Sequence, residues 1–260
     1  MDADICLKEI EAALDGLLPP ADGEAASLHT AMRWAVEGGG KRLRPLLCLA
    51  AAEAVGGRAA EAIMPACAVE LLHSYTLVHD DLPAMDNDTR RRGRPSTWAK
   101  FGEAVAILAG DALQALAFAT LARTPETAPG TAAKLLVALG NGGIGVVRGQ
   151  TADLDASCHN LDFIYEHKTA DLFVAAACMG AIAGGGTDAQ VEQLRTFAMH
   201  LGLAFQHEDD IIDDDSPVGR DEALRQVQAH TAAATAALDG LPGDVSLLRN
   251  LAERLADRTR

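Results

Sequence analysis

The chain has 260 residues, and its 22 lysines and arginines against 37 aspartates and glutamates give a formal net charge of −15. Nucleic acids and anionic membranes carry charge of the same sign, so this balance argues against either as the main partner. Hydrophobic residues make up 49% of the chain but aromatic residues only 4%, which predicts one large core packed with alanine and leucine.

Alanine-rich, proline-poor apolar runs favour helices throughout the chain, and no segment alternates convincingly as a strand would. Helices are predicted over residues 4–16, 25–37, 45–55, 60–82, 103–122, 131–148, 161–184, 188–213, 221–238 and 244–257. No linker or internal repeat divides residues 1–260. The predicted fold class is therefore all-α, a single-domain bundle of about ten helices.

Lys41, Arg42 and Arg44 directly follow the glycine run at residues 38–40. Such a run lets both backbone and side-chain donors approach a phosphate closely. Glycine–lysine combinations are common, so this segment by itself would be a weak signal for anion binding. The segment indicates anion binding only if a second phosphate-binding feature lies near it in the fold.

The first acidic cluster comprises Asp80, Asp81 and Asp86 and ends an apolar helical run. Carboxylates beside apolar residues are costly unless a cation or hydrogen-bond donors compensate them. Pro83 lacks the amide that would bond back to His79, so the helix should end or kink there and allow Asp86 to return toward Asp80. Four arginines follow at positions 90, 91, 92 and 94.

The second acidic cluster lies about half the chain later, at Asp209, Asp210 and Asp213. Asp209 and Asp213 are four residues apart and share one helix face, with Gln206 about one turn before them. Oxygen-rich clusters of this kind suit a hard divalent cation such as Mg²⁺. Two such clusters beside basic segments suggest a diphosphate held between metal ions and cationic side chains.

The ordered set of motifs resembles the polyprenyl synthetase (trans-isoprenyl diphosphate synthase) family, in particular its bacterial farnesyl diphosphate synthases. The matching stretches are residues 39–45, 70–93, 101–114, 149–154, 167–169 and 202–213. The resemblance implies an isoprenoid-synthase bundle around a central cavity. It also implies Mg²⁺-dependent condensation of isopentenyl diphosphate with dimethylallyl or geranyl diphosphate, with farnesyl diphosphate as the expected product.

The resemblance also implies a role for each matching residue. Asp80, Asp86 and Asp209 would bind about three Mg²⁺ ions together with the diphosphate, while Asp81, Asp210 and Asp213 would act indirectly. The remaining positions are Lys41, Arg44, His73 and Arg92 for isopentenyl diphosphate, Arg91 and Lys168 for the allylic diphosphate, and Thr169 and Gln206 facing the carbocation.

Chain length is expected to depend on the residues beneath the first acidic cluster. Thr76 lies four residues before Asp80 and so beneath it on a helix, whereas Tyr75 is rotated away by about 140°. The resemblance nevertheless implies that Tyr75 forms the floor of the elongation cavity and stops the product near fifteen carbons.

The chain departs from the family pattern after Asp213. A lysine-bearing loop is usual there, but residues 214–220 run directly into a predicted helix, and no lysine occurs after Lys168. We therefore expect one polyprenyl synthetase domain over residues 1–260, shortened after the second acidic cluster. An alternative is a weakly active or non-catalytic prenyltransferase-like subunit that binds isoprenoid diphosphates or a partner chain.

Five cysteines without a Cys-x-x-Cys spacing suggest reduced thiols, which predicts a cytoplasmic protein. A homodimer is expected from the resemblance. Apolar stretches at residues 104–122 and 170–184 contain Asp111 and Asp171, so they are predicted to be core helices rather than membrane spans.

Overall fold

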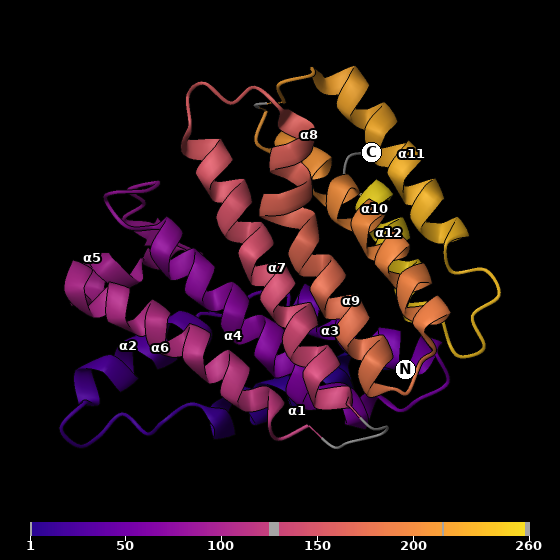
Figure 1. Ribbon diagram of the computed structural model, residues 1–260. Coiled ribbons are helices and arrows are strands. Elements are labelled where there is room, and N and C mark those ends of the chain that lie inside the picture. Colours follow the sequence, from indigo (N-terminus) through magenta and orange to yellow (C-terminus); the bar gives the residue numbers. More distant parts are fainter. Residues whose placement is uncertain (1, 125–129, 215, 258–260) are drawn as a thin grey trace.

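The computed structural model describes residues 2–124, 130–214 and 216–257, and helices dominate it (Figure 1). The longer helices are α1 (Ala3–Leu17), α2 (Ala26–Val36), α3 (Leu43–Ala54), α4 (Ile63–Asp80), α6 (Glu103–Leu121), α7 (Thr131–Leu154), α9 (Asp171–Ala183), α10 (Asp188–Ile212), α11 (Arg220–Ala236) and α12 (Ser246–Asp257). The all-α prediction is confirmed.

Helix α9 lies at the centre of the bundle and packs against α3, α7 and α10. Its side chains are apolar on every face, which is the pattern of a helix with no exposed side. Phe173 from α9 and Phe197 from α10 are among the fully buried side chains, together with many alanines and leucines. The core composition expected from the sequence is therefore the one observed.

Two helices predicted as continuous are interrupted. Residues 60–82 form a short 3₁₀ turn, η1 (Ala59–Ala62), followed by α4, which ends at Asp80 just before Pro83. Residues 161–184 divide into α8 (Leu161–Ile164), a π-helical turn η2 (Tyr165–Ala170) and α9. A π turn needs only one extra residue between packed helices, and the apolar periodicity gives no sign of it.

Three short elements, two strands and a helix, were not predicted at all. Strands β1 (Arg90–Arg91) and β2 (Arg94–Pro95) form an antiparallel hairpin, and α5 (Thr97–Phe101) follows it. Two-residue strands are too short to show alternation. The turn between them uses positive φ at Arg92 (51°) and Gly93 (78°), which fixes the direction of the arginines on either side.

The connection from α7 to α8 and the connection from α10 to α11 lie at the same end of the bundle (Figure 1). The second acidic cluster is at that end, because α10 finishes at Ile212. The fold thus brings the carboxyl end of α10 beside the turn that carries Lys168 and Thr169, which packs against α7 and α10.

Candidate active site

The first acidic cluster folds back on itself as predicted. Beyond the end of α4, the amide of Asp86 donates to the carbonyl oxygen of Asp80 at 2.9 Å. This bond closes a turn that includes Pro83, so Asp86 returns toward Asp80. The Gln150 amide nitrogen lies 3.4 Å from Asp86 Oδ1 and connects the cluster to α7. Gln150 belongs to a matching motif, but the sequence alone suggested no role for it.

Both acidic clusters carry unfavourable charge. Burial raises the pKa of Asp80 to about 6, with Lys168 opposing the shift and Asp86 adding to it. Burial likewise raises the pKa of Asp209 to about 6, with further contributions from Asp213 and Asp210. Each cluster also lies at a helix C-terminus, where the helix dipole already places partial negative charge. A cation at either place would relieve this repulsion.

The donor sets fit Mg²⁺ as an ion that arrives with an anionic ligand. In the described parts of the chain, no three His, Cys, Asp or Glu side chains converge as a ready-made metal site. Mg²⁺ commonly keeps several waters and takes only one or two protein carboxylates beside phosphate oxygens. Asp80 and Asp86 would supply two carboxylates at the first cluster, and Asp209 would supply one at the second.

Arg91 lies against the first cluster, where its guanidinium holds Asp81. Its Nε is 2.7 and 2.9 Å from the two Asp81 oxygens, and Nη2 is 2.6 Å from Oδ1. Asp81 is only 2% exposed, so it acts as a buried counterion rather than as a free carboxylate. The sequence predicted Arg91 as a diphosphate ligand but gave no indication of this pairing.

The four residues predicted to bind isopentenyl diphosphate line one cavity of about 400 Å³: Lys41, Arg44, His73 and Arg92. Arg44 Nη1 is 3.3 Å from His73 Nε2, and its guanidinium lies 4.6 Å above the ring centre of Phe173. Burial lowers the pKa of Arg44 to about 10, although Glu70 and Asp209 oppose the shift. Burial and then the nearby Arg44 lower the pKa of His73 well below its usual value.

This cavity has an unbalanced positive charge. Arg44 Nε is buried without a hydrogen-bond partner among the described residues. Arg92 donates to the Gly39 carbonyl and leaves its other donors near the cavity. Buried guanidinium donors without acceptors are costly, and an anion with several oxygens would satisfy them. The structure brings these four predicted residues together in one cavity, and their role in binding isopentenyl diphosphate stays a prediction.

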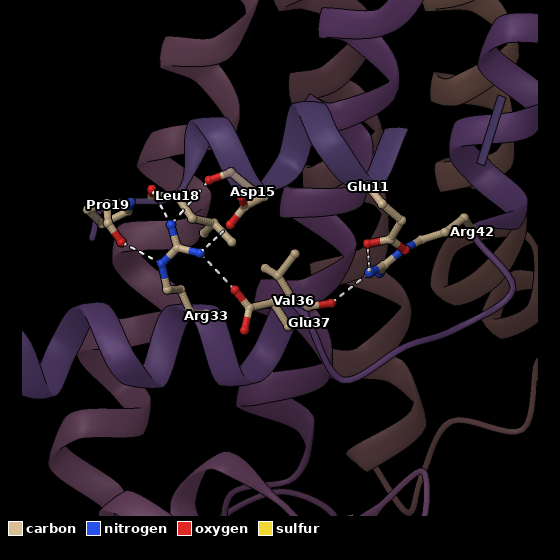
Figure 2. A network of polar contacts seen from close by, with 8 residues as sticks. All are labelled: Glu11, Asp15, Leu18, Pro19, Arg33, Val36, Glu37 and Arg42. Carbon is tan, nitrogen blue, oxygen red and sulfur yellow. Dashed lines mark hydrogen bonds and ion pairs between the residues drawn. The ribbon is translucent and has the colours of Figure 1, made fainter. Parts of the chain in front are cut away.

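Arg42 differs from its neighbours because its side chain is fully engaged within the fold. It forms ion pairs with Glu70 and Glu11, each at 2.7 Å, and donates to the Val36 carbonyl at 2.8 Å. Figure 2 shows the contacts with Glu11 and Val36, and beside them Arg33 joining α2 to the end of α1. Arg42 therefore anchors the start of α3 and positions Lys41 and Arg44.

The π turn η2 carries the predicted catalytic residues Lys168 and Thr169. A Cβ on Gly149 would overlap the Lys168 backbone, and one on Gly202 would overlap Ala170, so both glycines permit close packing of α7 and α10 on this turn. Thr169 Oγ1 donates to Gln206 Oε1 at 2.6 Å, so the structure brings these two residues together, while their place beside a carbocation stays a prediction. Lys168 Nζ pairs with Asp153 at 2.5 Å and lies close enough to Asp80 to affect its pKa.

Tyr75 and Thr76 line a second cavity, of about 250 Å³, which Asp80 also borders. Its other walls come from His79, Met85, Val146, Val147, Gln150, Thr151 and Leu154. The Tyr75 ring meets the His79 ring edge to face at a centroid distance of 5.6 Å. An apolar cavity below a carboxylate cluster suits a hydrocarbon chain that ends in a charged group.

Fold and site together define a helical protein with a cationic cavity and, beside it, a pair of acidic clusters whose carboxylates suit divalent ions. The family model for polyprenyl synthetases matches residues 25–220. The chain belongs to the polyprenyl synthetase family, as the motifs had suggested.

Individual relatives agree with this membership. The chain is 45% identical over 217 residues to the heterodimeric geranylgeranyl pyrophosphate synthase large subunit 1, chloroplastic, of Arabidopsis thaliana, covering 78% of this chain and 58% of that protein. It is 48% identical over 197 residues to the chloroplastic geranylgeranyl pyrophosphate synthase of Capsicum annuum, covering 72% and 53%. The chain thus spans less than two thirds of the length of these relatives.

A solved structure matches over nearly the whole fold. The FPP/GFPP synthase from Zymomonas mobilis superposes with a TM-score of 0.91 at 34% identity, covering 98% of this chain and 97% of that one. The isoprenoid-synthase architecture expected from the resemblance is confirmed by this neighbour.

The predicted cytoplasmic location is contradicted by these relatives, because those of Arabidopsis thaliana and Capsicum annuum are named as chloroplastic proteins. The inference rested on five free cysteines, four of which are buried. Buried thiols pack as small apolar side chains, and their presence does not distinguish one reducing compartment from another.

Proposed function

We propose that the chain is a trans-prenyltransferase that condenses isopentenyl diphosphate with dimethylallyl or geranyl diphosphate. The observation that supports this proposal is a cationic cavity in the same fold as two acidic clusters that do not line it. Lys41, Arg44, His73 and Arg92 line the cationic cavity, whereas the acidic clusters lie elsewhere. An enzyme acting on a single diphosphate would have no use for the second site.

In this proposal Asp80, Asp86 and Asp209 hold Mg²⁺, which when bound stabilises negative charge on the departing diphosphate. Arg91 and Lys168 assist on the allylic side. The allylic carbon–oxygen bond breaks with its electron pair leaving on diphosphate, and the double bond of isopentenyl diphosphate then forms the new carbon–carbon bond. Loss of a proton restores a double bond, and Thr169 and Gln206 face the intermediate carbocation.

The expected product changes in the light of the relatives. Farnesyl diphosphate was predicted, but the two plant relatives at 45% and 48% identity are geranylgeranyl pyrophosphate synthases. We therefore propose a twenty-carbon product. Farnesyl diphosphate stays a second candidate because Tyr75, a bulky and almost fully buried side chain, lines the cavity beneath Asp80.

A weakly active or non-catalytic subunit is the alternative role. It is favoured by the segment after Asp213, which reaches α11 at Arg220 without a lysine. One relative is also named as the large subunit of a heterodimer. In both roles the chain would form one catalytic-type domain that is shortened after the second acidic cluster.

We also propose a homodimer built on α6 and α7. Ile107 and Leu108 of α6 and Val137, Ile144 and Val147 of α7 are exposed large apolar side chains. Helix α6 is apolar and long enough to cross a membrane by composition alone, yet only 39% of that stretch is buried. A second copy would cover this face, and Asp111 with Arg148 gives it opposite charges in a chain that is otherwise strongly acidic.

Turnover of labelled isopentenyl diphosphate with each allylic partner tests the proposal. We expect Mg²⁺-dependent product with at least one partner, and mass spectrometry then gives its length. Sedimentation of the unmodified protein and of the Ile144→Glu variant tests the dimer. The glutamate would place a charge in the apolar interface, so the variant should sediment as a monomer. Absence of turnover with every partner, with diphosphate binding retained, would favour the non-catalytic subunit.

A further inference from the structure

A chain of three directed hydrogen bonds extends from the π turn into α10. Tyr165 OH donates to Asp210 Oδ2 at 2.5 Å, and Gln206 Nε2 donates to Asp210 Oδ1 at 2.8 Å. The hydroxyl of Thr169 donates to Gln206 Oε1 at 2.6 Å. These four residues line one cavity of about 220 Å³, together with Lys168 and Pro217. The motifs singled out Thr169 and Gln206 but gave Tyr165 no role.

The direction of these bonds follows from Asp210. A carboxylate only accepts hydrogen bonds, and both of its oxygens are engaged by donors. A glutamine side chain presents a donor at one end and an acceptor at the other, so Gln206 must turn its nitrogen to Asp210 and its carbonyl to Thr169. Thr169 must then donate its proton to Gln206, which leaves its oxygen lone pairs available to the cavity.

Burial makes this arrangement rigid. Tyr165 is 7% exposed, Thr169 7% and Asp210 9%. In the described parts of the chain no ion pair involves Asp210, so its charge is stabilised by the hydroxyl of Tyr165 and the amide of Gln206 rather than by a cation. Removing one donor from a buried carboxylate is costly, and the remaining groups would rearrange to compensate.

We propose that Asp210 and Tyr165 are positioning residues that fix the Gln206 amide, so that Thr169 directs its lone pairs toward the positive charge that develops on the allylic carbon. The inference deepens the proposed prenyl transfer and rests on it. A preoriented oxygen stabilises a carbocation without reorganising during the reaction. Asp210 thus acts through hydrogen-bond direction and not through its charge at the metal site.

A swap of the amide and the carboxylate separates these two roles. In Gln206→Glu two carboxylates face each other, which should push the new carboxylate away from Asp210, change the direction of the Thr169 hydroxyl and lower kcat by about 10²-fold. Adding Asp210→Asn restores a complete set of bonds. The carboxylate now at position 206 accepts from Thr169 and from the amide now at position 210, whose carbonyl oxygen accepts from Tyr165.

We expect the double variant to recover at least about tenfold in kcat over Gln206→Glu alone. A double variant no faster than the single one would overturn the proposal, because the charge would then be needed at position 210 itself.

Tyr165→Phe tests the other end of the chain. We expect kcat to fall about five- to tenfold, equivalent to the loss of one hydrogen bond, with KM for both diphosphates unchanged. An unchanged kcat would contradict a positioning role, whether or not KM rises. Thr196→Val is the matched control, because it removes a hydroxyl bonded to the Glu192 carbonyl at 3.1 Å elsewhere on α10.

A crystal structure of Tyr165→Phe provides a readout that does not depend on activity. The proposal predicts a rotated Asp210 and a gap above about 3.5 Å, beyond hydrogen-bond range, between Thr169 Oγ1 and Gln206. An unchanged Thr169–Gln206–Asp210 arrangement would overturn it. If the unmodified protein has no turnover, the proposed function fails, while this structural result still decides whether Tyr165 fixes the network.

Discussion

The backbone amide of Asp86 bonds to the carbonyl oxygen of Asp80 at 2.9 Å, and this single contact turns a six-residue spacing into one acidic cluster. Along a continuous helix the two carboxylates would be separated by about 9 Å of axial rise. Pro83 prevents that continuation because it has no amide to donate. The six-residue spacing of the two aspartates is therefore compatible with one cluster.

The contribution of Asp86 to Mg²⁺ binding can be measured without turnover. Asp86→Ala should weaken Mg²⁺-dependent binding of inorganic pyrophosphate about ten- to a hundredfold, because a charge-assisted contact is worth roughly 1.5–3 kcal/mol. Isothermal calorimetry measures the change, with Asp188→Ala at the far end of α10 as control. Equal affinities in Asp86→Ala and the control would remove Asp86 from the metal site.

Chain length should respond to Tyr75. Tyr75→Ala removes a buried ring from the cavity that also contains Thr76 and Val146, and it leaves Asp80 in place. The extra volume should shift the product toward longer chains by at least one isoprene unit, as measured by mass spectrometry. Identical product distributions in the variant and the unmodified protein would show that another residue sets the length.

The short segment after Asp213 predicts weak allylic binding. Losing one phosphate contact from a lysine corresponds to about ten- to a hundredfold in affinity. A Gly-Lys-containing loop inserted between Asp213 and Asp221 should therefore strengthen binding of a non-reactive allylic analogue in calorimetry, while affinity for isopentenyl diphosphate stays nearly unchanged. No gain from the insertion, or an equal gain for both ligands, would show that the segment is not the determinant.

Glu208 should make stability depend on pH. It is fully buried next to Asp209, and burial followed by the charge of Asp209 raises its pKa to about 8. Because the folded pKa lies above the unfolded value of about 4.3, its contribution is complete at low pH and is lost as pH rises through the folded pKa. Urea denaturation in EDTA should therefore show a stability loss on the order of 2 kcal/mol between about pH 6 and 8, with little further loss above the folded pKa.

Glu208→Gln removes this titration. The free energy of unfolding of the variant, relative to the unmodified protein, should rise steadily over the same pH interval. A difference between the two proteins that is independent of pH would mean that Glu208 does not titrate there.

The sequence predicted much of this molecule because its signals are local. Alanine-rich periodicity located α6 and α10 to within one or two residues, and Pro83 marked the end of α4. The family resemblance also grouped Lys41, Arg44, His73 and Arg92, which line one cavity in the structure. A resemblance carries information about segments that are distant in the sequence, whereas helical periodicity does not.

What the sequence missed depends on tertiary packing. The hairpin at Arg90–Arg91 is too short for an alternating pattern, and the π turn exists because α7 and α10 approach it closely at Gly149 and Gly202. The pairing of Arg91 with Asp81 is likewise a property of the folded site, because the two residues are ten positions apart along a loop and strand. The proposed role of Tyr165 follows from the hydrogen bond between its hydroxyl and Asp210, which the sequence does not show.

In the proposed reaction, the two acidic clusters and Mg²⁺ act together on an allylic diphosphate. The most direct measurement is the initial rate of isopentenyl diphosphate consumption, with Mg²⁺ and with EDTA, in the unmodified protein, Asp80→Ala and Asp209→Ala. We expect no product in EDTA and a loss of at least ~10²-fold in each variant, the size expected when a principal electrostatic group is removed. Near-normal rates in EDTA or in either variant would contradict it.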